Sequence, residues 1–272
     1  MDKGKTFRAL HEARSAFVIP NPWDIGTAKL LASLGFKALA TTSAGFAFSR
    51  GLPDGAVGFE MMIHHCREMA HATDLPVSAD LERGKGDTPE SAAETIFAAE
   101  AAGLAGCSIE DHSGDPHNPI YDFDLAVERV AAAADAARSL KRDFVFTARA
   151  ENYLWNRPDL DDTIRRLQAF EAAGADVLYA PGLYSLEEMR TVTSALKKPF
   201  NAVMGFADPA ITLEQLGQAG VRRVSIGGGL NRVAVKAFMD AAKQMRAGNF
   251  GFITSMAPMA EVRGAFQRPL KT

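Results

Sequence analysis

The 272-residue sequence predicts a (β/α)8 barrel, and three observations support this fold class. Apolar segments end abruptly in charged side chains at 77–84, 107–111 and 144–151. Helical patterns repeatedly end in a glycine that is followed at once by an apolar segment. The length is typical of one barrel, and no linker, low-complexity tract or charge block divides residues 1–272, which predicts a single domain.

The repeated helix, glycine and strand unit is what alternating βα units should produce. Strands are expected to begin near Phe17, Ala38, Val77, Cys107, Phe144, Val177, Phe200 and Val224. Helices are expected at 24–34, 89–102, 124–140, 159–173, 185–196, 212–219 and 233–247. Thr88 is a predicted N-cap, and Ser185 with Glu188 forms a capping box. Because helices cover both faces of parallel strands, nearly continuous apolar strands are expected.

Composition limits the class of partner. Thirty basic and 33 acidic residues give a net charge of −3, so we expect no nucleic acid partner and a small-molecule substrate instead. Cys66 and Cys107 are far apart and lack a CxxC pattern, which disfavours a disulfide framework or a zinc site and favours the cytoplasm. The amino terminus lacks an apolar signal core, and no run approaches the roughly 18 apolar residues of a membrane span.

The C-terminal extension, about 245–272, is unusually apolar at 249–259. Such a tail must either fold over the barrel or cover a neighbouring subunit. We favour the neighbour, and therefore a homo-oligomer.

Asp80, Glu82 and Glu110 are the strongest candidates for chemistry. On a strand, Asp80 and Glu82 would point the same way, and Glu110 would end the next strand. Hard oxygen ligands of this kind suit Mg²⁺. The alternative is that these residues are helix N-caps or ion-pair partners of Arg83 and Lys85.

Arg149 ends the fifth expected strand, and its donor fork could hold a substrate carboxylate or stabilise developing negative charge. Alternatively it neutralises Glu110 or Glu151, and Glu151 is itself a catalytic candidate. The connection 112–122 is placed to act as a lid, where His112 could be a general acid or base. Residues His64, His65 and His71 are expected on a surface or in packing.

Small residues Thr42, Ser43 and Ala44 follow the second expected strand and could let backbone N–H groups approach an anion. Asn201, in the seventh expected strand, is a further substrate-binding candidate. Asp54 lies in a turn, and its spacing alone suggests a structural role. The glycine run at 225–230 either permits a tight turn or, as a second choice, binds phosphate.

With these residues in view, the chain resembles the isocitrate lyase and phosphoenolpyruvate mutase superfamily, in its phosphonomutase-like branch, from residue 20 to 227. Thr42-Ser43-Ala44 resembles a turn whose backbone amides bind an α-keto acid carboxylate, and Gly51-Leu52-Pro53-Asp54 matches a family segment. Three further motifs resemble family counterparts: Asp80-Leu81-Glu82 its Asp-x-Asp metal pair, Ile109-Glu110-Asp111 its Ile-Glu-Asp, and Thr147-Ala148-Arg149 its Ala-Arg segment. The resemblance makes Asp54 an active-site residue and overturns the preference from spacing.

The resemblance implies a barrel that holds Mg²⁺ largely through waters and breaks or makes a C–C or P–C bond beside the carbonyl of an α-keto acid. It also implies a dimer or tetramer with exchanged C-terminal helices. The Lys-Lys-Cys-Gly-His loop of the lyases and the mutase loop lysine are missing, and Glu82 replaces an Asp. Isocitrate and methylisocitrate cleavage and true mutase activity are therefore disfavoured.

Three functions follow as hypotheses. The first is Mg²⁺-dependent C–C cleavage of a small α-keto acid, or of its 2-hydroxy or aldol-type carboxylate precursor, through an enolate, as a lyase or decarboxylase. The second is a P–C bond hydrolase or phosphonomutase acting on phosphonopyruvate or phosphoenolpyruvate. The third is a catalytically silent barrel that binds keto acids.

Overall fold

The structure is a computed structural model that describes residues 2–267. Eight parallel strands form one curled sheet, in the order β1-β8-β7-β6-β5-β4-β3-β2. The strands are β1 (Phe17–Val18), β2 (Leu39–Ala40), β3 (Val77–Asp80), β4 (Gly106–Glu110), β5 (Val145–Arg149), β6 (Val177–Tyr179), β7 (Phe200–Val203) and β8 (Arg223–Ser225). A backbone hydrogen bond of 3.1 Å from Ala40 N to Pro20 O links the two edges of the sheet. The (β/α)8 prediction is confirmed.

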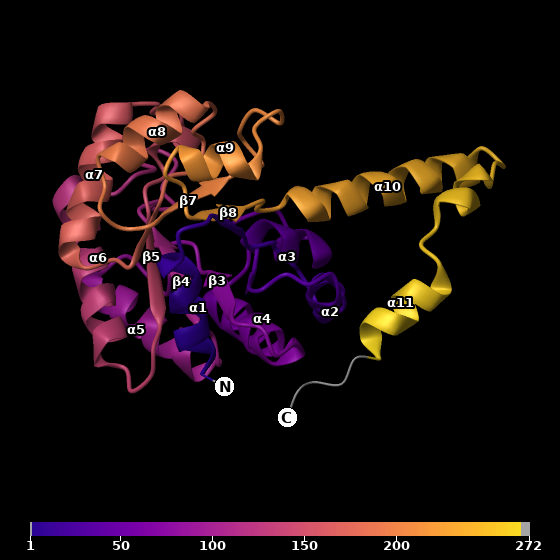
Figure 1. Ribbon diagram of the computed structural model, residues 1–272, viewed down its shortest axis with the longest axis horizontal. Coiled ribbons are helices and arrows are strands. Elements are labelled where there is room, and N and C mark those ends of the chain that lie inside the picture. Colours follow the sequence, from indigo (N-terminus) through magenta and orange to yellow (C-terminus); the bar gives the residue numbers. More distant parts are fainter. Residues whose placement is uncertain (1, 268–272) are drawn as a thin grey trace.

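Helices follow the strands in turn and cover the sheet from outside (Figure 1). The helices within residues 2–267 are α1 (Lys3–Glu12), α2 (Ile25–Ser33), α3 (Ser43–Ser49), α4 (Phe59–Ala72), α5 (Pro89–Ala101), α6 (Phe123–Ser139), η1 (Asn152–Trp155), α7 (Leu160–Ala173), α8 (Leu186–Ser194), α9 (Leu213–Gln218), α10 (Gly229–Arg246), η2 (Gly251–Ser255) and α11 (Met259–Phe266). Of these, α1 precedes β1, and α10, η2 and α11 extend away from the sheet. Thr88 caps α5, and the Ser185–Glu188 capping box is present. No helix within residues 2–267 combines the length and the apolar character needed to cross a lipid bilayer.

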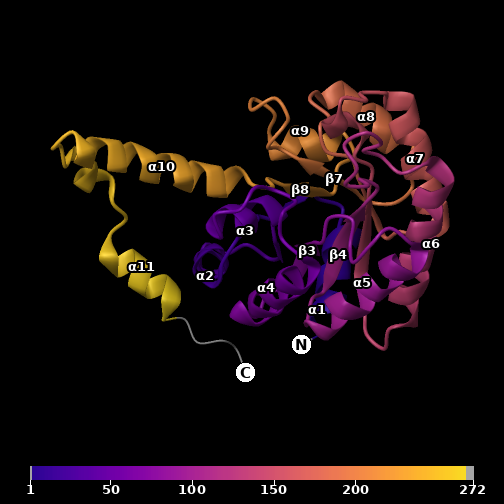
Figure 2. The ribbon, with the colours of Figure 1, turned by 180° about the vertical axis from the view of Figure 1, so that it is seen from behind.

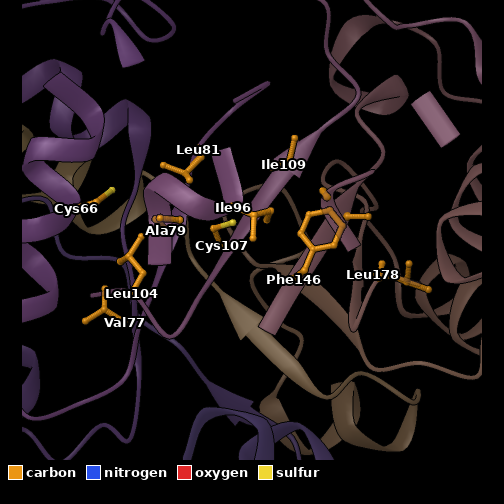
Figure 3. Packing of buried hydrophobic residues seen from close by; sticks show 14 of the residues in the cluster. Cys66, Val77, Ala79, Leu81, Ile96, Leu104, Cys107, Ile109, Phe146 and Leu178 are labelled. Atoms are coloured by element: carbon orange, nitrogen blue, oxygen red, sulfur yellow. The ribbon is translucent and has the colours of Figure 1, made fainter. Parts of the chain in front are cut away.

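The main hydrophobic core lies between the outer faces of the strands and the helices. Figure 3 shows Ala79, Cys107, Phe146 and Leu178, from four neighbouring strands, packed in this layer. The alternate residues point into the barrel, and several of them are polar. The expectation of nearly continuous apolar strands was therefore wrong toward the carboxyl ends of the strands, because inward-facing residues there line a cavity with polar groups.

Helix α1 closes the barrel at the amino ends of the strands. Phe7 packs there with Ile19, Val145 and Val177 in a smaller core. His11, on the same helix, is buried, and its Nδ1 lies 2.9 Å from the carbonyl oxygen of Phe7. Burial and the positive charge of Arg223 lower the pKa of His11 to about 3.

A pH effect on stability follows from His11. In the unfolded chain a histidine binds a proton below its ordinary pKa near 6.5, whereas folded His11 does so only near pH 3. Its stabilising contribution is therefore complete above about pH 6.5 and is lost as the pH falls toward 3, by up to about 1.4 kcal/mol per pH unit. Urea unfolding of His11→Gln should show a shallower acid dependence than wild type. Equal slopes would contradict the assignment of a neutral buried imidazole.

The C-terminal extension leaves the barrel as a long arm. Helix α10 projects outward from β8, and α11 returns toward α2 (Figures 1 and 2), which it contacts. Along α10, Asn231 is buried, whereas Val233 and Phe238 are 69% and 75% exposed. Helix α10 also begins at Gly229, four residues before the predicted start. Helix α11 thus packs against the barrel, whereas Phe250, Ile253, Met256 and Met259 stay more than half exposed.

Candidate active site

Three charged side chains meet at the carboxyl ends of β3, β4 and β5. Asp80, Glu110 and Arg149 are the last residues of these strands, and the strands are paired in parallel register. Arg149 Nη1 lies 3.4 Å from Asp80 Oδ1 and 3.4 Å from Glu110 Oε2. The sequence prediction that neighbouring strand ends gather these groups is confirmed in its geometry.

Glu151 is a buried fourth member of this cluster. It is 2% exposed, accepts a hydrogen bond from Arg149 Nε, and donates its own backbone N–H to Asp111 Oδ1 at 2.8 Å. Asp111 is held in turn by Arg166 at 3.1 Å. Burial raises the pKa of Glu151 and is opposed by the charge of Arg149. Glu151 therefore fixes the guanidinium of Arg149 from the side away from the cavity.

The alternative that the acidic residues are helix N-caps or ion-pair partners of Arg83 and Lys85 is excluded. Arg83 pairs with Asp87 at 3.5 Å and Lys85 with Glu94 at 2.6 Å, so neither neutralises the acidic group. Thr88, and none of the three acidic residues, caps the helix that follows β3. Arg149 does pair with Glu110 and Glu151, as the structural alternative for Arg149 suggested, and it also pairs with Asp80.

Glu82 joins the cluster for a different reason than predicted. β3 ends at Asp80, and Glu82 lies beyond it with φ at +50°, the left-handed region that non-glycine residues seldom adopt. The alternation of a strand therefore does not place it. Its backbone instead donates to Asp80 Oδ1 at 3.4 Å, and its carbonyl accepts from Glu110 N at 3.0 Å. Burial raises the pKa of Glu82 to about 8, and the carboxylates of Asp80, Glu110 and Asp54 add to this.

A cavity of about 140 Å³ lies beside this cluster, inside the barrel. Its volume is below the roughly 300–1,000 Å³ of pockets for drug-sized ligands, so it suits a small organic acid. Seven of the predicted site residues line it: Thr42, Ser43, Ala44, Asp54, Asp80, Arg149 and Asn201. The other four predicted residues lie outside this lining: Glu110 and Glu151 pair with Arg149, His112 faces Glu110, and Glu82 lies near Asp80 and Glu110.

The turn after β2 contacts Asp80 at the edge of the cavity. Ser43 donates to Asp80 Oδ2 from its hydroxyl at 2.9 Å and from its backbone N–H at 3.4 Å. Thr42 caps α3 by accepting from Gly45 N at 3.2 Å. Ser43 thus holds Oδ2 of Asp80, while Glu82 N and Arg149 Nη1 donate to Oδ1.

Asp54 lies in an exposed loop, yet its carboxylate reaches the cavity. Burial there, with the negative charges of Asp80 and Glu110, raises its pKa. Its bond with Gly55 N at 3.2 Å is the turn contact that spacing predicted. The structural role and a position at the site are both present.

His112 occupies the base of the 112–122 connection. Its Nδ1 lies 3.6 Å from Glu110 Oε1, and its ring stacks on that of Trp155 with centroids 3.9 Å apart. A bridge between His112 and Ile120 closes the loop on itself. The three histidines of α4 are not at the site: His64 and His71 are exposed, and His65 stacks on Phe46. The expectation that they have surface or packing roles is confirmed.

Sequence reasoning missed several residues of the cavity wall. Tyr179, Arg223, Ser108 and Asn21 all line it. The guanidinium of Arg149 lies 4.9 Å from the ring centroid of Tyr179. A signal was available, because polar residues recur at every second position in Ser108-Ile109-Glu110 and in Arg223-Val224-Ser225. That period of two marks the inward face of a strand.

The donor set fits a hard divalent cation held partly by waters. Five carboxylates act on the guanidinium of Arg149: those of Asp54, Asp80, Glu82, Glu110 and Glu151. Such an excess of negative charge is unfavourable unless a cation offsets it. Within residues 2–267 no three His, Cys, Asp or Glu side chains are arranged to hold one metal ion directly. Mg²⁺ usually keeps several waters and needs only one or two protein carboxylates, so the arrangement is compatible with it.

Polar groups at the carboxyl ends of barrel strands, around a small cavity, define the chain as an enzyme of the (β/α)8 class. The phosphoenolpyruvate phosphomutase family model matches residues 7–246. The chain therefore belongs to this family, within the isocitrate lyase and phosphoenolpyruvate mutase superfamily.

Relatives and solved structures agree. A crystal structure from Burkholderia cenocepacia J2315, described provisionally as a lyase or mutase, is 52% identical with a TM-score of 0.96 and covers 98% of this chain and 96% of that one. The 2-methylisocitrate lyase of Escherichia coli (strain K12) is 30% identical over 228 residues, 80% of this chain and 76% of the relative. The oxaloacetate decarboxylase of Paraburkholderia xenovorans (strain LB400) is 29% identical over 261 residues, 90% and 82% of the two chains. These similarities place the chain in a superfamily with C–C lyase activity.

Proposed function

We propose that this enzyme uses Mg²⁺ to cleave a C–C bond next to the carbonyl of a small α-keto acid, or of its 2-hydroxy precursor. The observation that carries the proposal is the convergence of Asp80 and Glu110 on Arg149 beside a small cavity. The names of the lyase and decarboxylase relatives support the reaction class.

Each residue has a role in this proposal. Asp80, Glu82 and Glu110 would hold Mg²⁺, largely through waters, and the ion would supply positive charge for an enolate oxygen. Arg149, fixed by Glu151, would stabilise the same developing charge. The turn at Thr42, Ser43 and Ala44 would bind the substrate carboxylate, and Asn201 would contribute to substrate binding from β7, on the cavity wall beside Arg223.

Two further residues would handle protons and access. Asp54 reaches the cavity from its loop, and its raised pKa favours a carboxyl that exchanges a proton. His112 would act from the base of the lid, where Trp155 and Glu110 fix its ring.

The function is tested by incubating the protein with oxaloacetate, phosphonopyruvate, methylisocitrate and dialkylmalates, with and without Mg²⁺. We expect pyruvate or bicarbonate to appear from a C–C substrate only when Mg²⁺ is present. Release of phosphate from phosphonopyruvate would instead support the second candidate, P–C bond hydrolysis or rearrangement, which the family description favours. Binding without turnover of any compound would indicate a silent keto-acid-binding barrel.

We also propose that the enzyme is a homo-oligomer, a dimer or tetramer, that buries the arm formed by α10 and α11. The exposed apolar residues of α10 and of the segment after it support this. Phe238→Glu should reduce the molar mass found by light scattering, whereas Lys236→Gln on the same helix should leave it unchanged. A monomeric wild type would contradict the proposal. The two buried free thiols fit a reducing compartment, and we propose the cytoplasm.

A further inference from the structure

The deep end of the site cavity contains a buried arginine with neutral partners. Arg223 is 5% exposed and lines the cavity from β8. Its Nε donates to Asn201 Oδ1 at 2.8 Å, and its Nη2 donates to Thr147 Oγ1 at 3.1 Å. Its Nη1 lies 3.4 Å from His11 Nε2. Within residues 2–267 no aspartate or glutamate forms an ion pair with it, in contrast to Arg149.

His11, the partner of Arg223 at the bottom of the barrel, cannot supply a negative charge to balance the guanidinium. His11 donates from Nδ1 to the carbonyl oxygen of Phe7, which leaves Nε2 as the acceptor that faces Arg223. The imidazole is therefore neutral, and so are the amide of Asn201 and the hydroxyl of Thr147. A buried charge without a counter-charge is unfavourable, and an anion in the cavity would remove that cost.

The cavity is consequently polarised along its length. Carboxylates of Asp54 and Asp80 line it toward the strand ends, and Arg223 lines its opposite, deep end. Tyr179 stands between the two arginines, under the guanidinium of Arg149 and close enough to Arg223 to influence its charge. Asn201 also donates to Ser225 Oγ at 3.1 Å, which orients its oxygen toward Arg223. The polar floor is thus built and held by hydrogen bonds rather than left by a packing defect.

We propose that Arg223 forms an anion subsite for the second carboxylate of the substrate, so that the preferred substrate is a small dicarboxylate. The proposal rests on the proposed function for the other end of that molecule, the keto or 2-hydroxy carboxylate near Asp80. The size of the cavity limits the two carboxylates to a short carbon chain. Arg223 therefore selects the substrate and does not take part in bond cleavage.

The test compares malate with 2-hydroxy-4-methylpentanoate, in which an isopropyl group of similar shape replaces the second carboxylate. Binding is measured by calorimetry with Mg²⁺ present, and oxalate serves as the probe for the metal end. Wild type should bind malate at least about tenfold more tightly than the isopropyl compound, since a charge-assisted hydrogen bond is a strong one. Arg223→Met should remove that preference and change the affinity for oxalate by less than about twofold.

Asn201→Asp provides a second variant that keeps Arg223 and changes almost no volume. Its carboxylate would lie against Nε of Arg223 and neutralise the guanidinium from within the protein. The variant should fold, shown by an unchanged circular dichroism spectrum, and should lose the malate preference as Arg223→Met does. If Arg223→Met does not fold, Arg223→Gln decides the matter, because it removes the charge and keeps a polar side chain beside Asn201.

Two results would overturn the assignment. One is an unchanged malate preference in a folded Arg223→Met or Arg223→Gln variant, because a purely structural Arg223 would produce that. The other is tighter binding of 2-hydroxy-3-phosphonopropanoate than of malate, because a phosphonate would then be the preferred anion. A failure of the proposed function would be seen separately, because oxalate binding would then not depend on Mg²⁺. The comparison of malate with the isopropyl compound can also be made without the metal, so it still tests Arg223.

Discussion

Replacing Asp80 by alanine should lower Mg²⁺-dependent kcat/KM by about 10³-fold, the loss typical when a group that stabilises transition-state charge is removed. The substitution removes the acceptor of the Ser43 hydroxyl and N–H and the carboxylate facing Arg149 at 3.4 Å. It therefore removes a metal-binding oxygen and loosens the turn proposed to bind the substrate carboxylate.

The measurement is turnover of the active compound across a Mg²⁺ titration, with oxalate binding by calorimetry as a second readout. Oxalate binding should become insensitive to Mg²⁺ in Asp80→Ala. Glu94→Gln is the matched control, because Glu94 is an exposed carboxylate whose partner is Lys85 at 2.6 Å. If Asp80→Ala kept full Mg²⁺-dependent activity, the metal assignment would have to be abandoned.

Replacing Arg149 by methionine should cost both activity and stability. Glu110 and Glu151 are buried, and each faces this guanidinium. Removal of one partner from a buried ion pair typically costs about 3–5 kcal/mol, because the remaining charge is left uncompensated. We expect that loss in the free energy of unfolding, measured in urea with a chelator present, together with a fall in kcat of about 10²–10³-fold.

The control for Arg149→Met is Arg138→Met, which removes an exposed guanidinium paired with Asp135. A surface pair of this kind contributes about 0–1 kcal/mol, so its unfolding curve should stay close to that of wild type. The pH dependence gives a further check. Burial raises the pKa of Glu151, so without Arg149 the carboxyl should favour its neutral form and the stability deficit should shrink as the pH falls. A loss below 1 kcal/mol for Arg149→Met would show that the buried carboxylates do not depend on this arginine.

The sequence by itself determined the fold and most of the strand ends. Glycine stops and apolar segments predicted eight βα units, because each helix must end before the next strand can join the sheet. Asp80, Glu110 and Arg149 could be placed together, since the carboxyl ends of parallel strands lie at the same edge. Small residues after the second strand indicated Thr42 and Ser43, motif resemblance added Asp54, and all three line the same cavity.

Only the tertiary structure decided how Glu82 reaches the cluster and what lies at the cavity floor. Glu82 is placed by one left-handed backbone conformation after β3, which strand periodicity cannot foresee. Arg223 is charged in the sequence like any surface arginine, and its burial beside Asn201 and His11 arises because β7, β8 and α1 converge at the bottom of the barrel. The local sequence pattern shows on which side of a strand a residue lies. The charged and polar groups that surround it there come from segments that can be more than 200 positions away, as for Arg223 and His11.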